Sequence, residues 1–131
     1  MAGSSRIRIS SGSPFEPVIG FSRAVVAGDR VLVSGTGPAF ADGSCPDDAA
    51  AQARRCMEII AAALTEAGVG LDDVIRTRMY LTSAADAEPV GAVHREAFGT
   101  ALPAATMVIV AGLADPRWKV EIEAEAMAGS A

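Results

Sequence analysis

The segment KVEIEAEA, residues 119–126, alternates strictly between apolar and acidic side chains after its first lysine. In a β-strand successive side chains point to opposite faces, so this segment is predicted to bury one face and to present three carboxylates on the other. These carboxylates belong to Glu121, Glu123 and Glu125. Like charges on one face repel one another, and glutamate is a poor strand former. The acidic face is therefore expected to meet water, a partner subunit or a ligand.

The rest of the chain is predicted to supply further strands and two helices. Strands are expected at residues 6–10, in a hairpin over 21–35 that turns at 27–29, at 74–82 and at 103–112. Helices are expected at residues 49–67 and 87–98, with loops at 12–17 and 35–47. Neither an internal repeat nor a linker divides the chain, so residues 1–131 are expected to form a single domain.

Each predicted helix has one apolar stripe, so each is expected to cover a sheet from one side only. The stripe of the first helix consists of Ala53, Cys56, Met57, Ile60, Ala63, Leu64 and Ala67. Gln52 is placed among the polar residues that cover the rest of that helix. In the second helix Pro89 must lie in the first turn, because an interior proline removes a hydrogen bond and clashes. This favours Asp86 over Ser83 as the N-cap.

The predicted fold class is α+β, with both helices on one face of the sheet and the other face open. Val120 and Ile122 suit the helix side, which places the three glutamates on the open face. Arg76, Arg78 and Tyr80 have the strand parity to share that face. A mixture of acids, arginines and an aromatic ring is a poor core but is typical of a subunit interface or a ligand cleft.

Composition excludes several classes of function. The net charge of −5 disfavours a nucleic-acid partner, because phosphate binding needs a concentrated basic patch. The first residues lack the apolar stretch of a signal peptide, and the absence of an 18-residue apolar run predicts no membrane partner and a cytoplasmic location. Cys45 and Cys56 are not spaced as a zinc or redox motif, and no metal site is expected. Cys56 is predicted to be a buried small hydrophobe.

Several segments, in this order and spacing, resemble the Rid (reactive intermediate deaminase, YjgF-type) family over nearly the whole chain. They are GFSRAVVAGDRVLVSGT, AAAQARRCMEIIAAALTEAGVGLDDVIRTRMYLT, HREAFG, LPAATMVIVAGL and VEIEAEA. The resemblance implies a chorismate-mutase-like fold, with two helices on one face of a six-stranded sheet. It also implies a homotrimer around the open sheet faces, with clefts for small-molecule ligands between neighbouring subunits.

The resemblance further implies hydrolysis of imines and enamines to ammonia and a keto acid, without a metal or organic cofactor. The catalytic acidic residue of the family matches Glu121. The serine of the family's SG motif matches Ser34, and its cleft-lining aromatic ring matches Phe21, which lacks the phenol oxygen of the usual tyrosine.

This chain departs from the family pattern at the site that binds the substrate carboxylate. The arginine that normally follows PA is replaced by Ala105, and the usual asparagine of the second helix is replaced by Gly91. The resemblance therefore implies a branch without the clamp arginine and with an altered substrate range. Met107 shares the parity of Ala105 and is predicted to line a more apolar cleft together with Phe21, whereas Thr106 is expected to pack against the helices.

Arg23 and Arg78 are the candidates for a substitute clamp, and an ion pair with one of the glutamates is the alternative for each. His94, the single histidine, is expected to be structural or pocket-lining, with a catalytic role as the alternative. Two functions stay open: an imine or enamine deaminase that uses Glu121, and a trimer that binds a small molecule without turnover. Ribonuclease activity is disfavoured by the acidic balance of the chain and the lack of a basic groove. Chorismate mutase activity is disfavoured because it needs several arginines converging on a dicarboxylate, and no more than two can be placed in the cleft.

Overall fold

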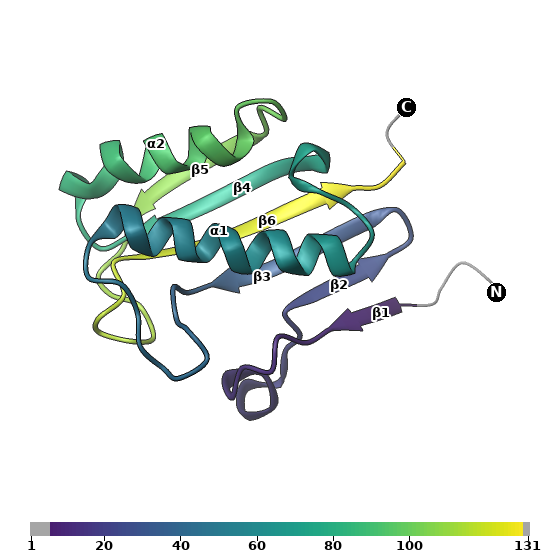
Figure 1. Ribbon diagram of the computed structural model, residues 1–131, viewed down its shortest axis with the longest axis horizontal. Helices are drawn as coiled ribbons and strands as arrows, with labels where there is room; N and C mark the ends of the chain where they lie inside the picture. The colour runs from purple at the N-terminus through teal and green to yellow at the C-terminus, as the bar shows by residue number, and fades with distance from the viewer. Residues whose placement is uncertain (1–5, 130–131) are drawn as a thin grey trace.

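Two helices cover one face of a six-stranded mixed sheet in the computed structural model, which describes residues 6–129 (Figure 1). The strands are β1 Arg6–Ile9, β2 Ala24–Ala27, β3 Arg30–Thr36, β4 Val74–Leu81, β5 Ala104–Ile109 and β6 Val120–Met127. The main helices are α1 Ala49–Glu66 and α2 Ala87–Phe98. Short helical turns lie at Glu16–Gly20, Leu71–Asp73 and Ala84–Asp86. The expected α+β architecture is confirmed.

The sheet has the order β1-β2-β3-β6-β4-β5. Strands β4 and β5 are parallel, and α2 makes the crossover between them, while the other neighbours are antiparallel. The acidic strand β6 is thus a central strand, although it is the last in the sequence. This position explains why every second residue of β6 is buried.

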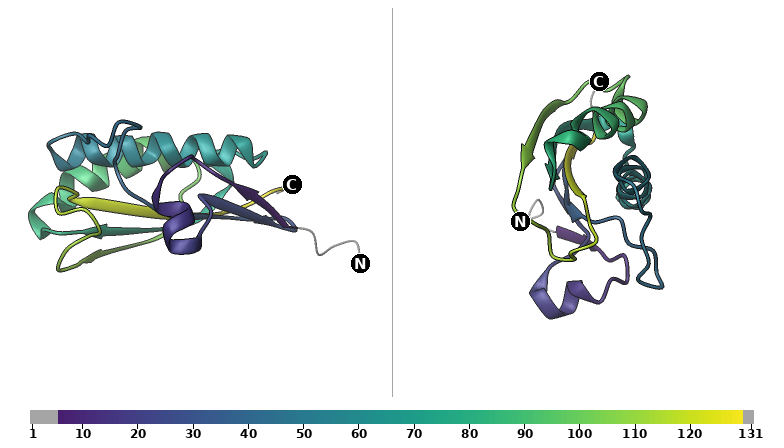
Figure 2. Two further views of the ribbon diagram at one scale, coloured as in Figure 1. Left: turned by 90° about the horizontal axis from the view of Figure 1, so that it is seen from below. Right: turned by 90° about the vertical axis from the view of Figure 1, so that its left-hand side faces the viewer.

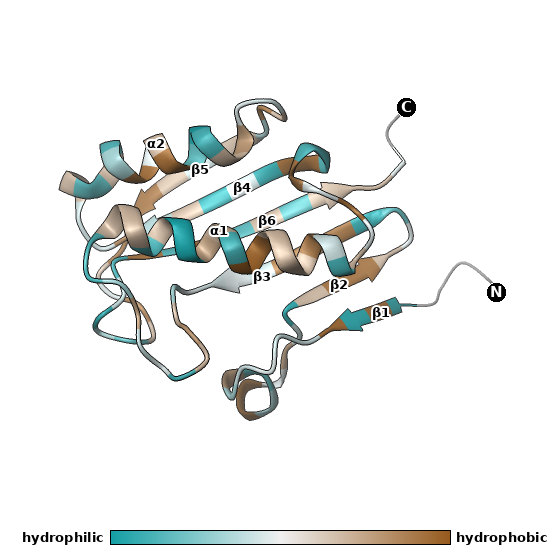
Figure 3. Cartoon of the chain, viewed as in Figure 1, coloured by the Kyte–Doolittle hydropathy of each residue, from teal (hydrophilic) through white to brown (hydrophobic). Residues whose placement is uncertain are grey.

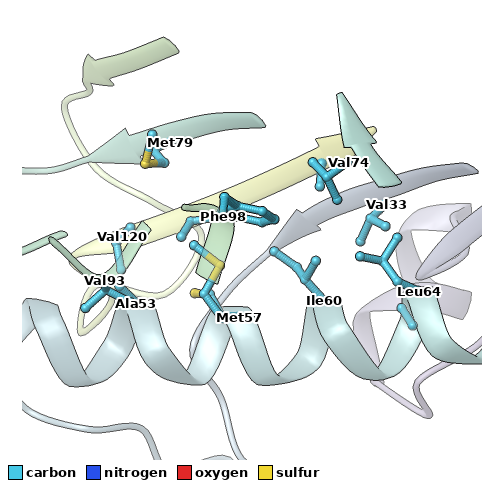
Figure 4. Packing of buried hydrophobic residues seen from close by; sticks show 14 of the residues in the cluster. Val33, Ala53, Met57, Ile60, Leu64, Val74, Met79, Val93, Phe98 and Val120 are labelled. Carbon is cyan, nitrogen blue, oxygen red and sulfur yellow. The ribbon is translucent and has the colours of Figure 1, made fainter. Parts of the chain in front are cut away.

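Helix α1 lies over β3 and β6 and supplies much of the core. Asp48 caps its first turn by accepting a hydrogen bond from the backbone N–H of Ala51, and Gly68 follows its end with a positive φ of 88°. Met57, Ile60 and Leu64 point from the helix toward the sheet (Figure 4). The predicted stripe is confirmed, with Ala67 only partly buried at its end.

The face of the sheet away from the helices is open (Figure 2). Tyr80, Arg78 and Arg76 of β4 lie opposite the three glutamates of β6, which confirms that these side chains share one face. Hydrophilic bands, coloured teal, accordingly alternate with apolar ones along β4 and β6 (Figure 3). None of the helices among residues 6–129 is both long and apolar enough to span a membrane.

Gln52 corrects the sequence prediction for α1. It was expected on the outer side of the helix, but only 1% of it is exposed. Its Nε2 donates to the carbonyl oxygens of Pro46 and Arg117 at 2.8 and 3.1 Å, and its Oε1 accepts from the backbone N–H of Lys119 at 2.7 Å. The amide therefore ties the loop before α1 to the loop before β6.

The predicted assignment of faces in β5 is wrong. Ala105 and Met107 pair with Thr77 and Met79, which are buried on the helix side, and Met107 packs against the core. Thr106, expected against the helices, pairs with Arg78 and is exposed. Because β5 is an edge strand and α2 covers little of it, periodicity alone did not identify its buried side.

Helix α2 begins at Ala87, as expected from Pro89, although the side chain of Asp86 makes no capping hydrogen bond. Ser83 instead caps the preceding turn, where its hydroxyl oxygen accepts from the N–H of Ala85. The chain before β2 also differs from the expected loop, because residues Glu16–Gly20 form a wide helical turn. This turn projects beyond the sheet next to β1 and β2 (Figure 1).

Candidate functional site

The candidate site lies where β3 bulges against β6. The pairing register between these strands shifts between Val33 and Thr36, so Ser34 and Gly35 lie in the irregular part. A Cβ atom added to Gly35 would lie 2.2 Å from Oε2 of Glu121. Only glycine therefore leaves room for this carboxylate to rest against the backbone of β3.

Arg23 contacts the backbone of the same glycine. Its Nη1 donates to the carbonyl oxygen of Gly35 at 2.9 Å and to Oγ1 of Thr36 at 2.8 Å. The guanidinium carbon lies 5.4 Å from the centre of the Phe21 ring, within cation–π range. Arg23 is only 6% exposed, and its buried Nε has no hydrogen-bond partner among the described residues.

The environment of Glu121 changes its ionisation. Burial raises the pKa of this carboxyl above its ordinary value, the positive charge of Arg23 partly offsets the rise, and the negative charge of Glu123 adds to it. A carboxylate whose pKa is shifted toward neutrality is better suited to exchange a proton at physiological pH than an exposed one. Glu121 therefore combines close contact with the backbone of β3 with altered acidity, and a perturbed carboxyl of this kind is a candidate for a functional site.

Ser34 and Phe21 lie in the segments expected to line the site. The hydroxyl of Ser34 donates to the carbonyl oxygen of Ser22 at 2.7 Å, and its backbone N–H donates to the carbonyl of Arg23. The serine thus fixes the chain that carries Phe21 and Arg23. Its contact with a ligand stays a prediction.

Glu16 is a component of the site that the sequence did not reveal. It is 6% exposed, and the positive charge of Arg23 helps to keep it ionised. Its carboxylate accepts hydrogen bonds from the hydroxyls of Ser10 and Ser11 at 2.8 and 2.6 Å, and from the backbone N–H of Ser11. Burial alone would raise the pKa of Glu16, but these bonds and Arg23 outweigh it and hold the pKa below its ordinary value. A lone glutamate in a segment without periodicity gave no signal of this burial.

Arg78 has a different partner. Its Nη1 donates to Oε2 of Glu123 at 3.1 Å, and the hydroxyl of Tyr80 donates to Oε1 of the same carboxylate at 2.5 Å. The hydrogen bond to Glu123 raises the pKa of Tyr80. Of the two alternatives for Arg78, the structure contains the ion pair with a glutamate, and a role as a ligand clamp stays a prediction.

Gly91, Ala105 and Met107 lie apart from Glu121, on α2 and on the helix side of β5. A Cβ atom on Gly91 would meet nothing within 4 Å, so this part of α2 faces open space. Met107 is partly buried and packs against the core, and its expected place in an apolar cleft with Phe21 stays a prediction. A contribution of Gly91 or Ala105 to a cleft between subunits stays a prediction.

His94 links α2 to β4 on the helix side. Its Nε2 lies 2.8 Å from Oγ1 of Thr77, and its ring packs on Phe98 with the centroids 4.8 Å apart. Burial lowers the pKa of this imidazole, so it is neutral at physiological pH. These contacts favour the structural alternative. No three His, Cys, Asp or Glu side chains within residues 6–129 gather as a metal site.

The chain matches the family model "Endoribonuclease L-PSP" over residues 12–128. The chain belongs to the YjgF/Rid family. An uncharacterised protein of Streptomyces coelicolor is 40% identical over 124 residues, which cover 94% of this chain and 92% of that protein. The family resemblance drawn from the sequence is therefore confirmed.

Solved structures agree with this membership of the YjgF/Rid family. Rv2704 of Mycobacterium tuberculosis, described as a member of the YjgF/YER057c/UK114 family, has a TM-score of 0.87 and 46% identity, covering 94% of this chain and 99% of that one. YyfA of Yersinia pestis, described as a protein of unknown function in the conserved Rid family, has a TM-score of 0.82 and 25% identity, covering 94% and 99%.

Proposed function

We propose that this YjgF/Rid protein is a cofactor-free hydrolase of imines and enamines, with Glu121 as its catalytic residue, and that it works as a homotrimer with ligand clefts between subunits. The observation that carries the proposal is the half-buried carboxylate of Glu121, which lies against Gly35 with its pKa raised by burial. The neighbouring Phe21 and Ser34 belong to segments typical of the family.

The proposed reaction uses one carboxylate and one water. The water oxygen attacks the imine carbon while the Glu121 carboxylate accepts a proton from that water. The C–O bond forms as the π electrons of the C=N bond move to nitrogen, which takes up the proton that Glu121 accepted. In the resulting carbinolamine the amino group gains a proton from solvent and leaves as ammonia, while the hydroxyl group loses its proton to solvent and becomes the carbonyl of the product. A positioned general base of this kind contributes about 10²- to 10⁴-fold to the rate.

The charges around Glu121 favour substrates without a carboxylate. Arg23 already donates to Gly35 and Thr36, Arg78 already pairs with Glu123, and Ala105 supplies no charge. An α-imino acid would bring its own carboxylate close to Glu121 and Glu123, and both Arg23 and Arg78 already have partners within the protein. A neutral imine, or the cationic iminium formed from it, meets no such repulsion.

The open face supports the proposed trimer. It holds ion pairs between Arg78 and Glu123 and between Arg30 and Glu125, with the half-exposed side chain of Leu32 beside them. A hollow of about 60 Å³ is lined by Leu32, Val33, Arg76, Arg78, Glu123, Ala124 and Glu125. A mixed polar and apolar face of this kind suits association with a second copy better than a core.

The test is ammonia release from imines generated in situ, with the oligomeric state checked by light scattering. An amino-acid oxidase supplies α-imino acids, and an amine oxidase supplies imines without a carboxyl group. We expect the protein to accelerate ammonia release from the carboxylate-free imines more than from the α-imino acids, because only the latter meet the repulsion described above. No acceleration on any imine by a folded trimer would contradict the proposed reaction.

That contradicting outcome would favour the second candidate, a trimer that binds a small molecule without turnover. The observation behind it is the pair of small residues, Gly91 and Ala105, at the two positions where the family resemblance implies an asparagine and an arginine. Endoribonuclease, the activity in the family model's name, fits the net charge of −5 poorly.

A further inference from the structure

We infer that Arg23, anchored on Gly35 and Thr36, is a positioning residue that keeps the carboxylate of Glu121 ionised, and that Glu16 supplies the counter-charge of Arg23. This inference rests on the proposed function, because it assigns a role to Arg23 through Glu121. It differs from the substitute-clamp interpretation, in which Arg23 would bind the substrate directly.

Gly35 is the point at which Arg23 and Glu121 meet. The carbonyl oxygen of Gly35 accepts from Nη1 of Arg23 at 2.9 Å, and its Cα faces the Glu121 carboxylate so closely that a methyl group would not fit. The second bond of Nη1, to Thr36, fixes the guanidinium from another direction. Arg23 is thus held by the same short segment of β3 that receives the carboxylate.

Glu16 is the acidic residue whose charge acts most strongly on Arg23. An arginine that is 6% exposed needs a counter-charge, because moving an unpaired charge into the protein interior is costly. Glu16 is equally buried, and Ser10 and Ser11 fix its carboxylate with three hydrogen bonds. The wide turn at Glu16–Gly20 therefore begins with a carboxylate that is held in position and ionised before any ligand binds.

The ionisation of Glu121 then depends on identifiable neighbours. Arg23 favours the carboxylate, Glu123 opposes it, and Tyr80 of β4 and the buried thiol of Cys56 in α1 are neutral at physiological pH, since the pKa of each is raised. A positive charge close to a carboxyl lowers its pKa by about one unit or more. Without Arg23, burial and Glu123 would act on Glu121 unopposed.

The inference predicts opposite shifts in two variants, measured by NMR titration of the ¹³C-labelled Glu121 carboxyl, whose signal is identified by its loss in Glu121→Gln. In Arg23→Gln the pKa of Glu121 is expected to rise by about one unit. In Glu16→Gln it is expected to fall, because Glu121 becomes the main carboxylate neighbour of Arg23. Arg23→Lys, which keeps the charge, is expected to restore most of the wild-type value.

An unchanged pKa in Arg23→Gln, or a rise in Glu16→Gln, would overturn the inference. If Arg23→Gln does not fold, the pKa of Glu121 in Glu16→Gln and in Arg23→Lys still shows whether the charge of Arg23 lowers it. In the pH profile of kcat/KM, the acidic limb is expected to move with the titrated pKa in each variant. The titration needs no turnover, so it tests the effect of Arg23 and Glu16 on the pKa of Glu121 even in an inactive protein. A protein inactive on every imine would contradict the proposed reaction but not this inference.

Discussion

Replacing Gly35 with alanine is expected to lower kcat/KM for imine hydrolysis by about a hundredfold, because a displacement of about 1 Å at a reacting group has an effect of this size. The new methyl carbon would lie 2.2 Å from Oε2 of Glu121, so the carboxylate must move. The displaced atom is the end of a flexible side chain, and Gly35 does not have a positive φ. The free energy of unfolding is therefore expected to change little.

The matched control for Gly35→Ala is Gly70→Ala. A Cβ atom on Gly70 meets nothing within 4 Å, and this glycine lies before the turn at Leu71–Asp73, outside the candidate site. Both variants are compared by steady-state ammonia release and by urea unfolding. Wild-type kcat/KM in Gly35→Ala would show that the position of Glu121 does not matter for the reaction.

Replacing Gln52 with leucine is expected to lower the free energy of unfolding by about 3 kcal/mol, since leaving a buried polar group unpaired costs roughly 1 kcal/mol or more. Three backbone groups lose their partner: the carbonyls of Pro46 and Arg117 and the N–H of Lys119. Leucine matches the helix propensity of glutamine, so the loss reports on these bonds. Urea denaturation gives the value.

Glu58→Leu is the control on the same helix. Glu58 is exposed and has a surface ion pair with Arg55, so its replacement is expected to change stability by less than about 0.5 kcal/mol. A loss below about 1 kcal/mol in Gln52→Leu would mean that water replaces the amide and that the two loops are not held by it.

The period of two in β6 was enough to predict that Glu121, Glu123 and Glu125 share the face of the sheet away from the helices. It succeeded because β6 is central and one of its faces is fully buried, so the hydrophobic pattern specifies the register strongly. The stripe of α1 was predictable for the same reason. In β6 and in α1 one side is buried, so apolar residues recur with the period of a strand and of a helix respectively.

Hydrophobic periodicity did not predict burial correctly where the buried residue is polar or where the strand lies at the edge of the sheet. Gln52 and Glu16 are buried through hydrogen bonds to backbone and serine groups, and a hydrophobic period does not record such partners. In β5 the two faces differ little in burial, so Met107 and Thr106 were assigned to the wrong sides. Family motifs indicated Glu121, Ser34 and Phe21. They did not indicate the coupling of charges that we infer between Glu16, Arg23 and Glu121.

The most direct test of the account is the rate of ammonia release from a carboxylate-free imine by the wild-type protein and by Glu121→Gln. Glutamine keeps the shape of the side chain but cannot accept the proton of the attacking water. The account predicts acceleration by the wild type and a loss of about 10²- to 10⁴-fold in the variant, both proteins having the same oligomeric state. Equal rates for the two proteins would contradict the central role of Glu121.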